Sequence, residues 1–167
     1  MIPDAGFVFS IAGLNASFAG LGGLLIGLRR GVDAQPLDTL RLRQVVEFAF
    51  ANLLLAISVQ PFVVLLGPDG GFRLSGGLAL VAIVGALPIL QRRVARVGIA
   101  WGRWWAASAI ALTAIGAVLA AATVIAPVAG TYELLMIVML ARPMVTFLLV
   151  LGAIDEPDPV SAGGPAQ

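Results

Sequence analysis

Long apolar runs alternate with short polar connections along this chain. Five runs have the length of a membrane-spanning helix, and they cover residues 7–28, 45–66, 74–90, 104–129 and 134–154. The hydrocarbon core of a bilayer requires about 20 consecutive apolar residues in a helix, with roughly 17 to 25 tolerated. The pattern therefore predicts an all-α fold, an integral membrane bundle of about five transmembrane helices that form one domain over residues 1–154.

The run at 74–90 is the shortest of the five. The sequence Gly-Pro-Asp-Gly-Gly at 67–71 precedes it and is a strong turn signal. We therefore expect the chain to reverse between the second and third runs. A re-entrant third segment is the alternative, and it would reduce the number of spans to four.

The basic residues predict the orientation. All ten are arginine, and eight of them fall in the first and third connections: Arg29, Arg30, Arg41, Arg43, Arg92, Arg93, Arg96 and Arg103. Under the positive-inside rule these two connections are cytoplasmic. The N-terminus is then outside and the C-terminus inside, where residues 155–167 are expected to form a disordered acidic cytoplasmic tail.

Composition agrees with a membrane class and narrows the chemistry. The chain is 60% hydrophobic and 11% charged, with a mean hydropathy of +1.03, whereas soluble domains are about a quarter charged. Histidine, cysteine and lysine are absent, so the usual ligands of zinc, copper and haem are missing, as are the usual partners of a serine nucleophile. We expect no cofactor, no metal site and no enzymatic activity.

Arginine and tryptophan alternate at the end of the third connection, in "RVGIAWGRWW" at 96–105. Basic residues with aromatic neighbours could suit nucleic acid, but such residues at a helix mouth are the default composition of a membrane interface. The expected partner is anionic lipid at the cytoplasmic face, and nucleic acid is not expected. The predicted headgroup residues are Arg92, Arg93, Arg96, Arg103, Trp101, Trp104 and Trp105.

Small residues recur in the first apolar run. Ala12, Ala16 and Gly20 are spaced by four, as are Ala19, Gly23 and Gly27. Small residues at this spacing allow two helix backbones to approach closely in a membrane. We expect Ala16, Gly20, Gly23 and Gly27 to pack inside the bundle, with a homo-oligomer or another membrane protein as the alternative partner.

Arg142 and Pro143 lie in the middle of the last apolar run. A charge at the centre of a span costs about 2.5 to 3.5 kcal/mol on insertion scales, so a partner is expected. Counting from the outer ends of the runs places Arg142 and Asn15 about 12 Å deep and Gln60 about 9 Å deep. Pro143 and Pro61 also free the carbonyls of Met139 and Ile57.

The arginine side chain has five N–H donors and no acceptor. Arg142 is therefore predicted to donate to Asn15, Gln60 or the carbonyls that the prolines free, with Thr146 on the same helix face. A second charge, Glu47, lies just inside the second run, four residues after Arg43, which predicts an interfacial ion pair.

The segments "FAGLGGLLIGLRRG" and "LDTLRLRQVVEFA" resemble a family of small multi-pass bacterial inner-membrane proteins of unknown function. The resemblance lies mainly in the first two helices. It implies a location in the bacterial inner membrane and no particular chemistry.

Two functions are compatible with this sequence. The favoured one is a structural or interaction role in the membrane, in which the cluster around Arg142 holds the helices in register. The alternative is a small channel or transporter for an anion or small polar solute, in which Arg142 attracts the solute.

Overall fold

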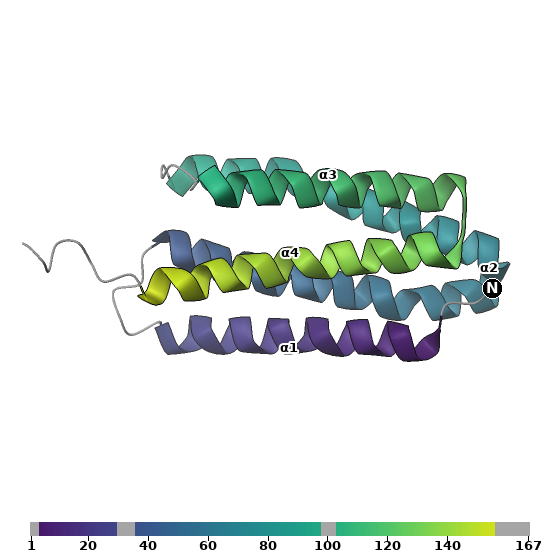
Figure 1. The fold of residues 1–167 in the computed structure, drawn as a ribbon, viewed down its shortest axis with the longest axis horizontal. Coiled ribbons are helices and arrows are strands. Elements are labelled where there is room, and N and C mark those ends of the chain that lie inside the picture. Colours follow the sequence, from purple (N-terminus) through teal and green to yellow (C-terminus); the bar gives the residue numbers. More distant parts are fainter. Residues whose placement is uncertain (1–3, 30–35, 98–102, 156–167) are drawn as a thin grey trace, which may run out of the picture.

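Almost all of the chain that the structure describes is helical. The computed structural model describes residues 4–29, 36–97 and 103–155, and the side chains of 4–28, 39–93 and 107–151. Four helices account for these residues: α1 (Ala5–Arg29), α2 (Pro36–Val97), α3 (Arg103–Ile125) and α4 (Ala129–Asp155) (Figure 1). Each is long and apolar enough to cross a membrane. The all-helical class is confirmed, and the number of helices is four where five were expected.

Helix α2 contains both the second and the third predicted spans. It has 62 residues, and only Gly67 leaves helical geometry, with φ 75° and ψ 170°. A straight helix of that length would extend about 93 Å, yet Arg93 Nη1 lies 2.6 Å from Glu47 Oε2. The first half of α2 (36–66) and its second half (68–97) therefore fold back against each other, as the blue and teal ribbons in Figure 1 show.

The reversal is tighter than the predicted turn at 67–71. Gly67 has a positive φ, which a residue without a Cβ adopts at no steric cost. Helical geometry resumes at Pro68, because the first position of a helix needs no N–H donor. A Cβ on Gly71 would lie 2.6 Å from the backbone nitrogen and Cα of Val63. Two glycines thus make the close approach of the two halves possible.

The boundary between α3 and α4 also differs from prediction. The expected spans were 104–129 and 134–154, but α3 ends at Ile125 and α4 begins at Ala129. Pro127 disfavours helical geometry in the residue before it, which ends α3. The residues around Pro127 are apolar, so hydrophobicity alone did not reveal the break. Helix α4 reaches Asp155, and the predicted tail from 156 onward lies outside the described residues.

Helix α4 is central in the bundle (Figure 1). It contacts α1, α2 and α3, whereas α1 and α3 do not contact each other within the described ranges. Helix α1 packs along the first half of α2, where Gly22 faces Val45 and Val46, and α3 packs along the second half, where Gly76 faces Thr123. The arrangement leaves spaces between the two halves of α2 and between its second half and α3.

The interior and the outside of the bundle are both apolar. Tyr132 is fully buried against Phe72, and its hydroxyl donates to the carbonyl of Leu55 over 2.8 Å, which joins α4 to α2. On the outside, Val64 is 81% exposed and Ile125 is 79% exposed. Apolar patches of this kind on a surface indicate contact with a membrane or another protein.

Candidate functional site

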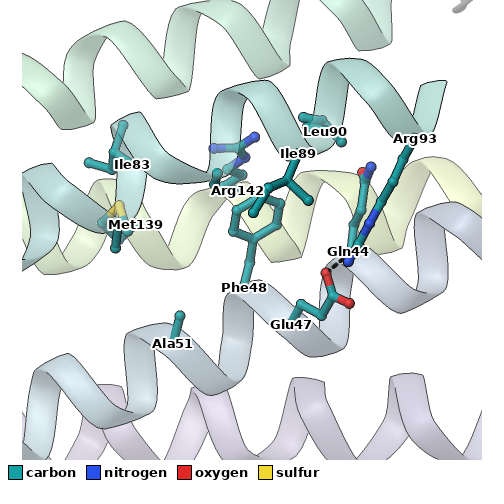
Figure 2. A pocket seen from close by; sticks show the side chains of 12 residues that line it. Gln44, Glu47, Phe48, Ala51, Ile83, Ile89, Leu90, Arg93, Met139 and Arg142 are labelled. Atoms are coloured by element: carbon teal, nitrogen blue, oxygen red, sulfur yellow. Dashed lines mark hydrogen bonds and ion pairs between the residues drawn. The ribbon is translucent and has the colours of Figure 1, made fainter. Parts of the chain in front are cut away.

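Arg142 is a buried charge at the middle of α4. Its exposed fraction is 8%, and its Cζ lies 3.9 Å from the centre of the Phe48 ring. Figure 2 shows the guanidinium directed toward the second half of α2, with Phe48 beside it. A cation over an aromatic face is attracted by about 0.5–2 kcal/mol. This contact orients the guanidinium but leaves its N–H donors unused.

None of the donors of Arg142 has a hydrogen-bond acceptor among the described side chains and carbonyls. Asn15 donates to the carbonyl of Ile11 in its own helix over 2.9 Å. Thr146 donates to the backbone carbonyl of Arg142 over 3.0 Å and not to its side chain. The structure therefore does not form the hydrogen-bonded cluster of Arg142, Asn15, Gln60 and Thr146 that the sequence predicts.

The depth estimate explains part of this difference. The predicted depth of about 12 Å for Arg142 counts from residue 134 as the outer end of the last span. Helix α4 begins at Ala129 instead, so Arg142 lies about 20 Å from the start of its helix. Arg142 is level with Phe48 on α2, and Gln60 is twelve residues further along, or about 18 Å away. Gln60 thus belongs to another level of the bundle. No described side chain donates to the carbonyl of Ile57.

Asn52, which lies in the apolar first half of α2, is not among the site residues that the sequence predicts. Its side-chain amide donates to the carbonyl of Met139 over 2.6 Å, and its exposed fraction is 1%. This is the carbonyl that Pro143 frees, and it is one of several acceptors that the sequence predicts for Arg142. The signal in the sequence that could have indicated Asn52 is a single side-chain amide in an otherwise apolar run.

Asn15 and Asn52 lie at a similar level. Gly22 faces Val45 and Val46 where α1 and the first half of α2 run antiparallel, and each asparagine is about seven residues beyond that contact. The side-chain oxygen of each is buried, and no donor from the described residues reaches it. Polar atoms therefore remain unsatisfied near the middle of the bundle.

Two spaces meet at Arg142. A central cavity of about 180 Å³ lies between the two halves of α2 and α4, with Gln44, Glu47 and Arg93 among its lining residues. A lateral groove of about 640 Å³ lies between the second half of α2 and α3, with apolar walls. Ile83, Leu90 and Arg142 line both. The guanidinium is therefore at the junction of the central cavity and the lateral groove.

Glu47 is the one carboxylate among the described residues that line the central cavity, and both of its oxygens are engaged by other arginines. Arg43 Nε lies 2.8 Å from Oε1, which confirms the predicted ion pair, and Arg93 Nη1 lies 2.6 Å from Oε2 (Figure 2). Arg93 is 46 residues away in sequence, so local spacing could not predict its contact. No ion pair joins Glu47 to Arg142 in this described region. The charge of Arg142 remains without a counterion there.

The prediction that the small residues of α1 pack inside the bundle is wrong. Ala16, Gly20, Gly23 and Gly27 are exposed, and a Cβ on any of the three glycines would meet nothing within 4 Å. The buried face of α1 instead contains Val8, Ile11, Ala12 and Asn15. Spacing by four identifies a helix face but does not determine which face turns inward.

The predicted headgroup residues are described only in part. The side chain of Arg92 is exposed, and Arg93 pairs with Glu47. Arg96, Arg103, Trp101, Trp104 and Trp105 lie outside the described side chains. Their interfacial role stays a prediction.

Comparison of the chain with models of protein families, with curated proteins and with solved structures finds no match. The resemblance of the first two helices to small bacterial inner-membrane proteins stays a prediction.

Proposed function

We propose that this is a membrane protein that binds an anion inside its helical bundle and acts as a small channel or transporter for it. The observation that carries the proposal is Arg142, whose exposed fraction is 8% and whose N–H donors have no acceptor among the described residues. Beside its contact with Phe48, it lines two spaces. We infer a binding role and no catalytic one, because the chain has no histidine, lysine or cysteine.

Electrostatics favours an anion as the missing partner. Arginine keeps its charge, and an unpaired charge in a bundle is costly, so residues of this kind pair with other groups or face a solute pathway. Glu47 is engaged by Arg43 and Arg93. The competing structural role would require the Arg142 guanidinium to donate hydrogen bonds to side chains or carbonyls of the bundle. It has no such acceptor among the described residues: Asn52 takes the Met139 carbonyl, and Thr146 bonds only the backbone of Arg142.

The spaces between the two halves of α2 support movement of a solute. A third space, of about 650 Å³, extends toward Pro61 and is open to the outside of the bundle, where its lining residues Leu54 and Ile57 are exposed. It shares Ala51 and Ala82 with the central cavity. A solute bound at Arg142 thus has further space along the bundle.

We also propose five crossings of a bacterial inner membrane, with the N-terminus outside and the C-terminus inside. The reversal of α2 at Gly67 supports two crossings within that helix. The arginines of the first and third connections support the orientation. Labelling of single-cysteine variants at Asp4 and Gly163 from opposite sides of the membrane is the expected result. Labelling of both from the same side would contradict it.

Anion binding is tested by thermal unfolding of the purified protein with chloride, formate, sulfate or phosphate. A ligand of the folded state raises the melting temperature, so at least one of these anions should stabilise the wild type but not Arg142→Met. Arg92→Met is the matched control, because Arg92 is exposed. Proteoliposome flux of the same anion should also require Arg142. Equal stabilisation of wild type and Arg142→Met would contradict the proposal.

The second candidate is an interaction role in the membrane. The exposed face of α1 that contains Gly20, Gly23 and Gly27 favours it, because small residues allow another helix to approach closely. Disulfide cross-linking of Gly23→Cys in membranes should then exceed that of Val118→Cys, an exposed position on α3. Equal cross-linking at the two positions would contradict this role.

A further inference from the structure

We infer that the anion held by Arg142 is amphiphilic, a single-chain carboxylate of the fatty-acid class whose chain lies in the lateral groove. The inference rests on the proposed function and specifies the class of ligand. It follows from the juxtaposition of one buried cation with one long apolar groove.

The walls of the lateral groove suit a hydrocarbon chain. Its volume is about 640 Å³, within the usual range of ligand sites. It follows residues 83–91 of α2 and 109–117 of α3, which corresponds to about 12 Å along each helix. Val84 and Ile110, on its two sides, are 55% and 69% exposed, so the groove opens to the outside of the bundle. A chain can enter it from the surrounding lipid.

Among the described residues that line the lateral groove, Arg142 is the one that can hold an anion. The other polar lining residues are Thr113 and Gln91. The hydroxyl of Thr113 donates to the carbonyl of Ala109 over 2.6 Å, and Gln91 is exposed and uncharged. Arg142 combines burial, charge and unused donors.

The shape of the guanidinium favours a carboxylate. Its planar fork can donate two parallel hydrogen bonds to the two oxygens of one carboxylate. The ring of Phe48 holds the guanidinium at Cζ from one side, and the carboxylate would approach its edge from the groove. The headgroup would then lie at Arg142, and the chain would extend along Leu87 and Ile110.

Photolabelling in phosphatidylcholine nanodiscs tests this arrangement. The probe is hexadecanoic acid with a diazirine in mid-chain, and the comparison probe is hexadecanol with the same diazirine. The acid should label peptides that contain residues 83–91 and 109–117 in the wild type. Labelling of Arg142→Met should be at least about tenfold weaker, because a hydrogen bond to a charged group contributes at least a factor of ten. The alcohol should label wild type and variant alike.

A second pair of variants tests the groove without altering the charge. Ala114 lines the groove and is exposed, so Ala114→Phe should block the chain and remove acid-specific labelling. Ala111 is exposed on the same helix but does not line the groove, so Ala111→Phe is the matched control. Stabilisation by the short anions should persist in both variants, which shows that each is folded.

The outcomes separate the two proposals. Equal labelling by acid and alcohol, or labelling that Ala114→Phe leaves unchanged, would overturn the fatty-acid inference. If short anions still stabilise the protein through Arg142, the proposed function stands without it. If neither short anions nor the acid depend on Arg142, both proposals fail.

Discussion

The side-chain amide of Asn52 donates to the carbonyl of Met139 across 2.6 Å, and Pro143 is the residue that deprives this carbonyl of its helical donor. The bond joins the first half of α2 to α4 at a fully buried position. It satisfies the backbone at the proline without any contribution from Arg142. The nearby guanidinium is therefore not needed at this carbonyl.

Replacement of Asn52 by leucine should destabilise the protein by about 1–2 kcal/mol, because the Met139 carbonyl would stay buried without a donor. The same replacement should cost less in a Pro143→Ala background, where the backbone N–H of residue 143 can donate to Met139. Thermal or denaturant unfolding of the two single variants and the double variant in detergent measures this coupling. Additive effects of the two changes would contradict the assignment of this hydrogen bond.

Gly71→Ala should destabilise the protein by about 1–3 kcal/mol, because the added Cβ would overlap the backbone of Val63 at the reversal of α2. Gly77→Ala is the control on the same half of the helix. A Cβ there meets nothing within 4 Å, and alanine favours a helix by about 1 kcal/mol over glycine. Unfolding of both variants should give opposite signs, and equal signs would count against the tight reversal.

Gly22→Leu should destabilise the bundle more than Gly23→Leu. A Cβ on Gly22 lies 2.9 Å from Cγ2 of Val46, whereas one on Gly23 meets nothing within 4 Å. Overpacking of this kind costs about 1–3 kcal/mol. The melting temperatures of the two variants in detergent show which face of α1, that of Gly22 or that of Gly23, is packed against the bundle. A larger loss in Gly23→Leu would show that the opposite face is packed.

Arg142→Met should leave the stability within about 1 kcal/mol of the wild type, because the lost contact with Phe48 is offset by removal of a buried charge. Arg142→Lys should be less stable than Arg142→Met, since a compact ammonium keeps the charge without the planar group that stacks on the ring. Unfolding in detergent without added anion measures both. A large loss of stability in Arg142→Met, without a similar loss in Arg142→Lys, would indicate a structural role for this arginine.

Glu47→Gln should lower stability by less than about 1 kcal/mol, and the loss should shrink in concentrated salt, because the ion pairs are partly exposed. Arg93→Gln should cost more than Arg43→Gln. The side chain of Arg93 is 30% exposed and that of Arg43 is 63% exposed, and only Arg93 joins the two halves of α2. Unfolding of Arg93→Gln and Arg43→Gln in low salt tests this, and a larger loss of stability in Arg43→Gln would contradict it.

Local pattern sufficed for much of the fold. Apolar length predicted the helices of a membrane bundle, and the glycines after Leu66 predicted a reversal, because both properties belong to short stretches of chain. The pair of Arg43 and Glu47 followed from their spacing of four on one helix. The sequence also indicated that Arg142 needed a partner, since its charge is independent of its surroundings.

Tertiary structure decided which helix faces meet and which groups are level with each other. The small residues of α1 could face either way, and the packing of Val8, Ile11 and Asn15 turns Gly23 outward. Arg93 reaches Glu47, and Asn52 reaches Met139, only because α2 reverses and packs beside α4. Contacts between residues distant in sequence depend together on where each helix begins and ends, on which of its faces turns inward, and on the level of each residue in the bundle. An error of five residues in the start of α4, or about 7.5 Å, accounts for part of the separation between Arg142 and Gln60.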